Sequence, residues 1–317
     1  MYFRSFPQLT ILFRALIVIT TCITFGALQQ TAFAKSFSCS SALALCNNQS
    51  KLGRSDGPLV GRSTLKGMSG LVGPYVTDPN AYDYYAGGLQ NSTAEGAGGY
   101  FGQYVPSLGP DSGRAGEHSL AELAVEDYYG EQVVEVGWIV APSIFRDGRP
   151  HLFVFYWVDG VGKGYNTSAF YHIPGTPQPG QRVAVDGKTH LYVIRFFQGN
   201  WWIRYDNTWI GYYPGTLWNN KANSNKFTQV STASWFGEVA VPKPKVDPCQ
   251  VQMGTGLLGD SNGSAVINDM YFVVNGTAVI AQATAIQTNA SDYDVGNFTG
   301  NSFTYGGPGD TSILDCP

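Results

Sequence analysis

The chain has 317 residues, with 19 Lys and Arg against 23 Asp and Glu, and only 13% of its residues are charged. This acidic balance argues against the basic surface that nucleic-acid-binding proteins present, so we expect no nucleic-acid partner. Aromatic residues make up 14% of the chain and glycines number 39, a composition typical of packed sheets joined by many turns.

The first 34 residues have the three regions of a secretory signal peptide. Arg4 and Arg14 precede an apolar run over residues 15–28, and the small residues Ala32 and Ala34 suit cleavage after Ala34. The run is shorter than the roughly 20 residues that a membrane-spanning helix needs, which makes a membrane anchor the weaker interpretation. We therefore expect a secreted protein, extracellular or periplasmic, that has left the membrane after signal removal and acts as a monomer.

Residues 35–79 are rich in Ser, Gly and Asn and show little periodicity. We interpret them as a linker or short pro-segment, and an irregular cap on the following domain is an equally open alternative. Residues 80–317 then form one catalytic domain.

Four cysteines remain in the mature chain: Cys39, Cys46, Cys249 and Cys316. An even number in a secreted protein predicts two disulfides, and four cysteines allow three pairings. We favour a local Cys39–Cys46 loop and a Cys249–Cys316 bond that ties down the C-terminus. The sequence lacks a second close Cys or His pair, so we expect no zinc site, and it indicates no cofactor.

From about residue 80 the pattern becomes short apolar or alternating runs between Gly, Pro, Asn and Asp, which predicts strands and turns. The clearest predicted strands are residues 133–140, 152–158, 190–197, 201–205, 209–213, 235–241, 265–274 and 278–286. Residues 118–127 fit a strand and a short helix equally well. Gly199-Asn200 predicts a hairpin turn. The fold class that follows is all-β, a single antiparallel two-sheet β-sandwich of the jelly-roll kind.

Glu135 and Glu238 each stand inside an apolar predicted strand, where burial of a carboxylate is costly. Strand alternation puts Glu135 on a face with Gly137, and puts Glu238 on a face with Phe236 and Ala240. If both strands belong to one sheet, the carboxylates can meet on one concave surface, where Gly137 leaves room for a substrate. The alternative, an outward and solvated glutamate on an edge strand, is about as consistent with the spacing.

Two carboxyl groups held close together suit amide hydrolysis by activated water. Mutual repulsion makes such a pair share one proton, so the ionised member accepts a proton from water and the protonated member donates one. This chemistry favours acid pH. His118, His151, His172 and His190 lie in no motif of a serine nucleophile, and we expect them to be structural.

A cluster of aromatic residues is the second notable feature: Trp201, Trp202, Tyr205, Trp209, Tyr212 and Tyr213. Such side chains bind proline-rich peptides or sugar rings, or they pack a core. Because adjacent strand residues face opposite sides, about half of this cluster should be structural.

Seven motifs resemble, in order, the catalytic domain of neprosin-like glutamic peptidases. They are Val134-Glu135-Val-Gly-Trp138, residues 149–157, Asn200-Trp-Trp-Ile-Arg204, Ile210-Gly-Tyr-Tyr-Pro214, Trp235-Phe-Gly-Glu-Val239, Gln252-Met-Gly-Thr-Gly256 and Tyr305-Gly-Gly-Pro-Gly309. The resemblance implies a β-sandwich endopeptidase that cleaves on the carboxyl side of proline at acid pH, with Glu135 and Glu238 as the catalytic pair. We expect substrate contacts within or beside these motifs from Trp138, Trp201, Tyr205, Tyr212, Tyr213 and Gln252.

Three features depart from the family pattern. Phe236 stands where the family usually has Gly, which narrows the predicted cleft beside Glu238. The cysteine pair that plant members carry after the strand of Trp157 is missing, and residues 35–79 do not resemble their long pro-domain. Two further functions remain open at this point: a glycoside hydrolase that uses the same two carboxylates, and a non-catalytic carbohydrate-binding sandwich. For the favoured peptidase, the partner is a peptide or protein substrate, rich in proline.

Overall fold

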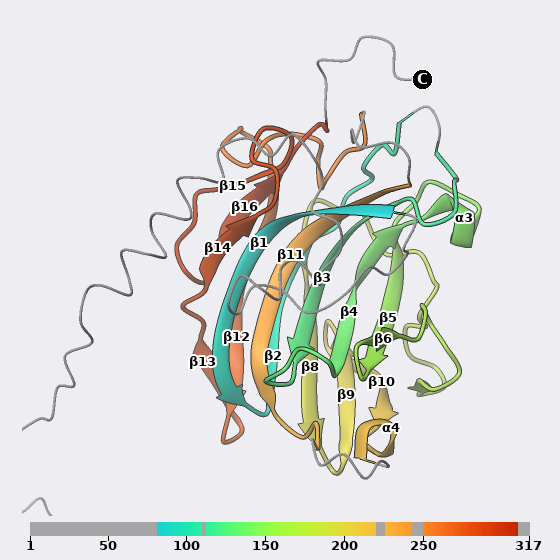
Figure 1. Cartoon of the computed structure of the whole chain (residues 1–317), viewed down its shortest axis with the longest axis vertical. Helices are drawn as coiled ribbons and strands as arrows, with labels where there is room; N and C mark the ends of the chain where they lie inside the picture. The colour runs from blue at the N-terminus through green and yellow to red at the C-terminus, as the bar shows by residue number, and fades with distance from the viewer. Residues whose placement is uncertain (1–80, 110–111, 220–225, 243–249, 310–317) are drawn as a thin grey trace, which may run out of the picture. The chain divides into compact units, whose positions relative to one another are not determined.

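The computed structural model describes residues 81–109, 112–219, 226–242 and 250–309 (Figure 1). The predicted signal peptide at 1–34, the segment 35–79 and all four mature cysteines lie outside these ranges, so those expectations stay predictions. Among the described residues, no helix combines the length and the apolar character that a membrane crossing requires.

Two antiparallel sheets account for nearly all of the regular secondary structure among the described residues, which confirms the predicted all-β class and the two-sheet sandwich. The first sheet has seven strands in the order β14-β1-β11-β3-β4-β5-β6. Their bounds are Ala81–Ala94 (β1), His118–Glu126 (β3), Val133–Val140 (β4), His151–Val158 (β5), Val161–Gly162 (β6), Val230–Pro242 (β11) and Thr284–Gln287 (β14). This sheet faces the viewer in Figure 1.

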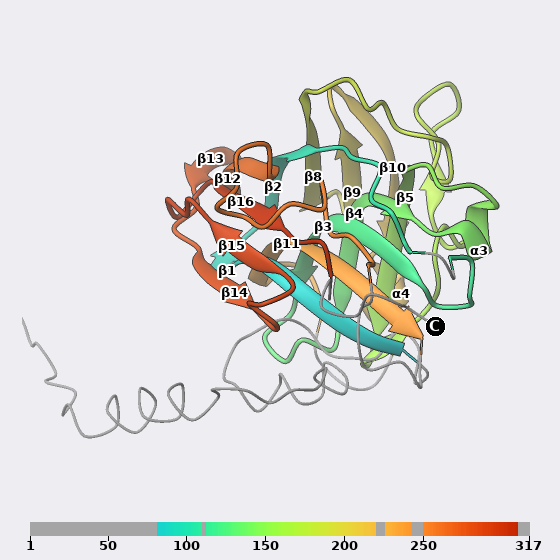
Figure 2. The same cartoon turned by 90° about the horizontal axis from the view of Figure 1, so that it is seen from above.

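The second sheet has nine strands and runs β15-β16-β12-β2-β8-β9-β10-β7, with β13 paired to β12. Their bounds are Gly96–Gly102 (β2), Tyr171–His172 (β7), Thr189–Phe197 (β8), Asn200–Tyr205 (β9), Thr208–Pro214 (β10), Ala265–Val274 (β12), Thr277–Ile280 (β13), Asp294–Gly296 (β15) and Phe303–Gly306 (β16). Two single-turn helices, α3 (Pro142–Phe145) and α4 (Thr216–Asn219), follow strands β4 and β10. Figure 2 shows the two sheets as separate layers.

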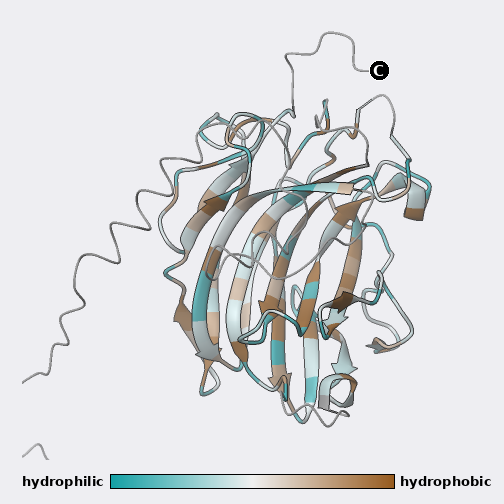
Figure 3. Cartoon of the chain, viewed as in Figure 1, coloured by the Kyte–Doolittle hydropathy of each residue, from teal (hydrophilic) through white to brown (hydrophobic). Residues whose placement is uncertain are grey.

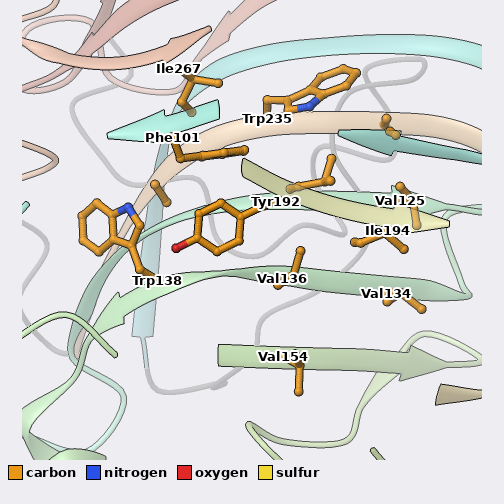
Figure 4. Packing of buried hydrophobic residues seen from close by; sticks show 14 of the residues in the cluster. Phe101, Val125, Val134, Val136, Trp138, Val154, Tyr192, Ile194, Trp235 and Ile267 are labelled. Carbon is orange, nitrogen blue, oxygen red and sulfur yellow. The ribbon is translucent and has the colours of Figure 1, made fainter. Parts of the chain in front are cut away.

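The core fills the space between the two sheets. Figure 4 shows Trp138 and Val136 of β4 pointing toward Tyr192 and Ile194 of β8, with Phe101 of β2 beside them. All five side chains are fully buried, and each contributes roughly 1.5–3 kcal/mol when its apolar surface leaves water. The other face of the first sheet is also apolar near β5, whose sequence is hydrophobic along almost its whole length (Figure 3).

The predicted strands 133–140 and 265–274 have the observed bounds of β4 and β12. Residues 118–127 form strand β3 and not a helix, because each residue from 118 to 126 pairs with β4, β11 or both. The predicted strand 278–286 is two strands, since β13 pairs with β12 and β14 pairs with β1 in the other sheet. Strands β1 and β2 were not predicted; four of the seven residues of β2 are glycines, which are unfavourable inside a strand.

The hairpin between β8 and β9 turns one residue earlier than predicted. Phe197 pairs with Asn200, so the turn residues are Gln198 and Gly199, with φ of 50° and 76°. Two successive positive φ angles are the mark of the two-residue turn whose twist matches the flanking strands.

The sequence suggested that Gly137 leaves room for a substrate, and the structure shows that it does not. A Cβ at this position would collide with the backbone of β3, at the carbonyl oxygen of Ala121 and the Cα of Glu122. The glycine therefore lets β3 and β4 approach each other closely on the face that carries Glu135.

We predict that Gly137→Ala lowers the free energy of unfolding by about 1–3 kcal/mol, since the strands must separate to admit the methyl group. Gly148→Ala is the matched control, because its added Cβ meets no atom within 4 Å. Urea unfolding of the two variants checks this. Equal midpoints for both variants would contradict the assigned role of Gly137.

Candidate active site

Glu135 and Glu238 lie on one face of the seven-stranded sheet. Strand β3 separates β4 from β11, and Glu238 pairs with Leu120, which in turn pairs with Ile139. Ile139 and Glu135 are four residues apart on β4 and share a face, so Glu135 shares it with Glu238. Both strands are interior to the sheet, which removes the alternative of an edge strand with a solvated glutamate.

Two more acidic side chains complete a diagonal row on this face. Glu122 of β3 pairs with Gly137 and Phe236, and therefore lies between Glu135 and Glu238. Asp83 of β1 pairs with Ala240, two residues beyond Glu238. We call Asp83, Glu238, Glu122 and Glu135 the carboxylate row. The four members lie on four neighbouring strands, β1, β11, β3 and β4. From one strand to the next, the register position of the carboxylate shifts by two residues in the same direction.

All four members of the carboxylate row are buried, with exposed fractions of 3% for Asp83, 2% for Glu238, 1% for Glu122 and 3% for Glu135. A buried carboxylate requires hydrogen-bond donors, an opposite charge or a proton. The structure gives Glu135 and Glu238 different partners of this kind.

Glu238 contacts a buried histidine. The Nε2 atom of His118 lies 3.0 Å from Oε1 of Glu238, and Nδ1 of the same ring lies 3.0 Å from the carbonyl oxygen of Gly116. Burial alone lowers the pKa of His118, but the hydrogen bond to Glu238 and the charges of Glu238 and Asp83 outweigh it, and the pKa is raised. The sequence interpretation of His118 as purely structural therefore misses its contact with a candidate catalytic residue.

Glu135 accepts a hydrogen bond from the indole of Trp157, with 2.7 Å between Nε1 and Oε1. Trp157 lies on β5, where it pairs with Val133, two residues from Glu135. The tryptophan is 1% exposed, so this bond forms away from water, and it fixes the orientation of the carboxyl group.

Tyr165 packs beside the carboxylate row. Its ring packs against Phe155 and Phe153 at centroid distances of 4.8 and 5.4 Å, and against His118 at 6.2 Å. Burial raises the pKa of Tyr165 well above its usual value, and the charges of Glu238, Glu122, Glu135 and Asp83 raise it further. Because burial and all four carboxylates raise its pKa, the hydroxyl of Tyr165 keeps its proton.

A cavity of about 360 Å³ adjoins this end of the sheet. His118 and Tyr165 line it on the side of the carboxylate row, and Glu117, Ser143 and Ile144 line it elsewhere. The cavity therefore borders the side chain that contacts Glu238.

The residues predicted to contact substrate lie elsewhere. Trp138, Trp201 and Tyr213 are fully buried in the core between the sheets, and the indoles of Trp138 and Trp201 donate to the carbonyl oxygens of Gly102 and Phe227. Their burial gives them packing roles and does not support direct contact with a substrate.

The remaining three predicted contacts belong to other parts of the sandwich. Tyr205 accepts a hydrogen bond from Gln103. Tyr212 stacks on Tyr171 with ring centroids 5.3 Å apart, and Gln252 accepts a hydrogen bond from the backbone N–H of Ser107. Tyr205 and Tyr212 come from strands of the nine-stranded sheet, so the structure does not bring them to the face of Glu135 and Glu238.

Sequence reasoning missed five residues of the site: Asp83, His118, Glu122, Trp157 and Tyr165. Glu122 could have been predicted from the sequence. It lies between Ala121 and Leu123 in an apolar strand, as Glu135 lies between Val134 and Val136. Asp83 lies in β1, a strand that was not predicted. In the described ranges, no three His, Cys, Asp or Glu side chains are arranged to hold a metal ion.

The fold and the site define a two-sheet sandwich with buried carboxyl groups on the outer face of one sheet. The sequence model of the family described as Neprosin matches residues 115–308, a range that contains Glu135, Glu238, His118 and Tyr165. The chain belongs to the neprosin family and is a peptidase.

Solved structures with a similar chain path come from several classes. Scytalido-glutamic peptidase in complex with a transition-state analogue is 12% identical, with a TM-score of 0.38 over 71% of this chain and 98% of that one. A glycoside hydrolase family 16 endo-glucanase from Bacteroides ovatus is 10% identical, with a TM-score of 0.30 over 53% and 71% of the two chains. At this distance such likenesses do not discriminate between peptide and glycan chemistry.

We predict that Trp157→Phe lowers peptidase activity at least about tenfold, because Glu135 loses the donor that orients it. Trp235→Phe is the control: this indole is equally buried, but donates to the carbonyl oxygen of Gly98. Both variants should lose similar packing, so steady-state kinetics of folded samples separate the two effects. Equal activity losses in both variants would show that the bond to Glu135 has no specific role.

Proposed function

We propose that this protein is a secreted glutamic endopeptidase that hydrolyses peptide bonds on the carboxyl side of proline at acid pH. Glu135 and Glu238 form its catalytic pair. The observation that carries the proposal is the shared face of these two buried side chains, each held by a different partner. Secretion rests on the signal-like N-terminus, and the preference for proline rests on the family resemblance.

The chemistry requires one proton between the two catalytic carboxyl groups. The ionised carboxylate accepts a proton from water as the water oxygen attacks the peptide carbonyl. The protonated carboxyl group donates its proton to the developing oxyanion or to the leaving nitrogen. Like charges at short range disfavour double ionisation, so the active state belongs to the pair and has two macroscopic pKa values.

The other members of the row strengthen this proton requirement. Glu122 lies between Glu135 and Glu238, and Asp83 lies on the far side of Glu238. Each additional negative charge near the pair disfavours loss of its last proton. Activity therefore peaks in acidic solution and falls toward neutrality.

Aromatic side chains surround the row. Phe155 pairs with Glu135, Tyr85 pairs with Glu238, and Phe153 pairs with Gly137. These rings are buried, so they pack around the carboxyl groups, and the preference for proline rests on the family resemblance alone. Phe236, which packs edge-on against Tyr85 at 5.6 Å, stands where the family usually has Gly, so the subsite beside Glu238 is narrower than in typical members.

We predict that Glu135→Gln and Glu238→Gln each reduce kcat about a hundredfold to ten-thousandfold on a proline-containing peptide, because each removes one partner in proton transfer. Glu95→Gln is the matched control: Glu95 forms a partly exposed ion pair with Arg195 on the other sheet. Circular dichroism should show all three variants folded. Full activity in either dyad variant would refute the catalytic pair.

A further inference from the structure

The contacts of His118 fix how many protons it shares with Glu238. The carbonyl oxygen of Gly116 can only accept, so Nδ1 at 3.0 Å from it must carry a proton. The contact of 3.0 Å between Nε2 and Oε1 of Glu238 then contains one proton, which belongs either to the imidazole or to the carboxyl group. The first arrangement is an imidazolium–carboxylate ion pair, and the second is a neutral pair.

The surroundings of His118 favour the ion pair. Two carboxylates act on its ring: Glu238 of β11, at 3.0 Å, and Asp83 of β1. Tyr165, after β6, packs edge-on against it at 6.2 Å, Glu117 precedes it in the chain, and Glu122 lies four residues away on the same face of β3. The groups that can be charged in this set are all acidic, so they stabilise a positive imidazole. The net effect on the pKa of His118 is upward, although burial opposes it.

We propose that His118 is a positioning residue that keeps Glu238 ionised in acidic solution and thereby makes Glu238 the base and Glu135 the acid of the catalytic pair. The assignment of base and acid rests on the proposed function, whereas the ion pair itself does not. Glu135 is suited to the complementary role, since the indole N–H of Trp157 that donates to it carries no charge. The proton taken from water moves to Glu238, and the proton that Glu135 holds moves to the leaving nitrogen.

The raised pKa also links His118 to stability. An unfolded histidine titrates near pH 6.5. Because the folded pKa lies higher, the stabilisation by the ion pair is complete below about pH 6.5 and is lost as the pH rises through the folded pKa.

The kinetic test uses His118→Gln, which can keep a hydrogen bond to Glu238 but carries no charge. Without the imidazolium, Glu238 accepts a proton more readily. The acid limb of the kcat/KM profile should therefore shift to higher pH by about one to three units. His151→Gln is the matched control, because His151 has the same pattern of contacts, with Nε2 at 2.9 Å from Asp147 and Nδ1 at 2.7 Å from the carbonyl oxygen of Gly180. An acid limb that stays in place in His118→Gln would overturn the proposal.

A second measurement needs neither activity nor a folded His118 variant. In ¹⁵N-histidine-labelled wild-type protein, both ring nitrogens of His118 should be protonated at about pH 6.5 and should titrate above it, and Glu238→Gln should lower that midpoint. A neutral His118 ring at or below this pH would overturn the ion pair. Absence of peptide hydrolysis at every pH would refute the proposed function, and the ion pair would still be judged by this titration.

Discussion

Burial of several carboxyl groups on one face of a sheet is the constraint on which this structure depends. An isolated ionised carboxylate in an apolar environment is strongly destabilised, so each member of the carboxylate row requires a proton, a donor or an opposite charge. His118 supplies a charge to Glu238, and Trp157 supplies a donor to Glu135. The site therefore contains two chemically different carboxyl groups within one continuous row.

The core of the sandwich offsets the free-energy cost of burying these carboxyl groups. The opposite face of the same strands packs against the nine-stranded sheet, where Trp138, Trp235 and Tyr192 are fully buried and provide the apolar stabilisation. Gly137 pairs with Glu122 and lets β3 and β4 approach closely on the face of the row, so a larger side chain here would alter the spacing between Glu122 and Glu135. One face of β4 thus packs in the core between the sheets, and the other carries Glu135, a member of the proposed catalytic pair.

Much of the fold could be predicted from the sequence. Strand alternation alone gave the bounds of β4 and β12 and the opposite faces of Glu135 and Trp138. It could not give the order of strands in the sheet, because register depends on partners that are far apart in the chain, such as β1 with β11. The diagonal that joins Asp83, Glu238, Glu122 and Glu135 exists only after that register is known.

The predicted substrate contacts show the other limit of sequence reasoning. Trp201 and Tyr213 belong to motifs that resemble the family, yet a motif can persist because its side chains fill the core. His118, in contrast, carried no motif, and its role follows from a contact between residues 120 positions apart. Residue type together with the family resemblance singled out the two glutamates as candidates, whereas their partners required the structure.

The central claim is that the carboxylate row is the centre of an acid peptidase. Digestion of a proline-rich protein between about pH 3 and pH 8, a range that spans the ordinary pKa values of Glu and His, tests it most directly when mass spectrometry maps the new termini. New C-terminal prolines should accumulate in acid, decline toward neutrality and be absent with Glu238→Gln. Equal cleavage by that variant, or cleavage that increases above neutral pH, would contradict it.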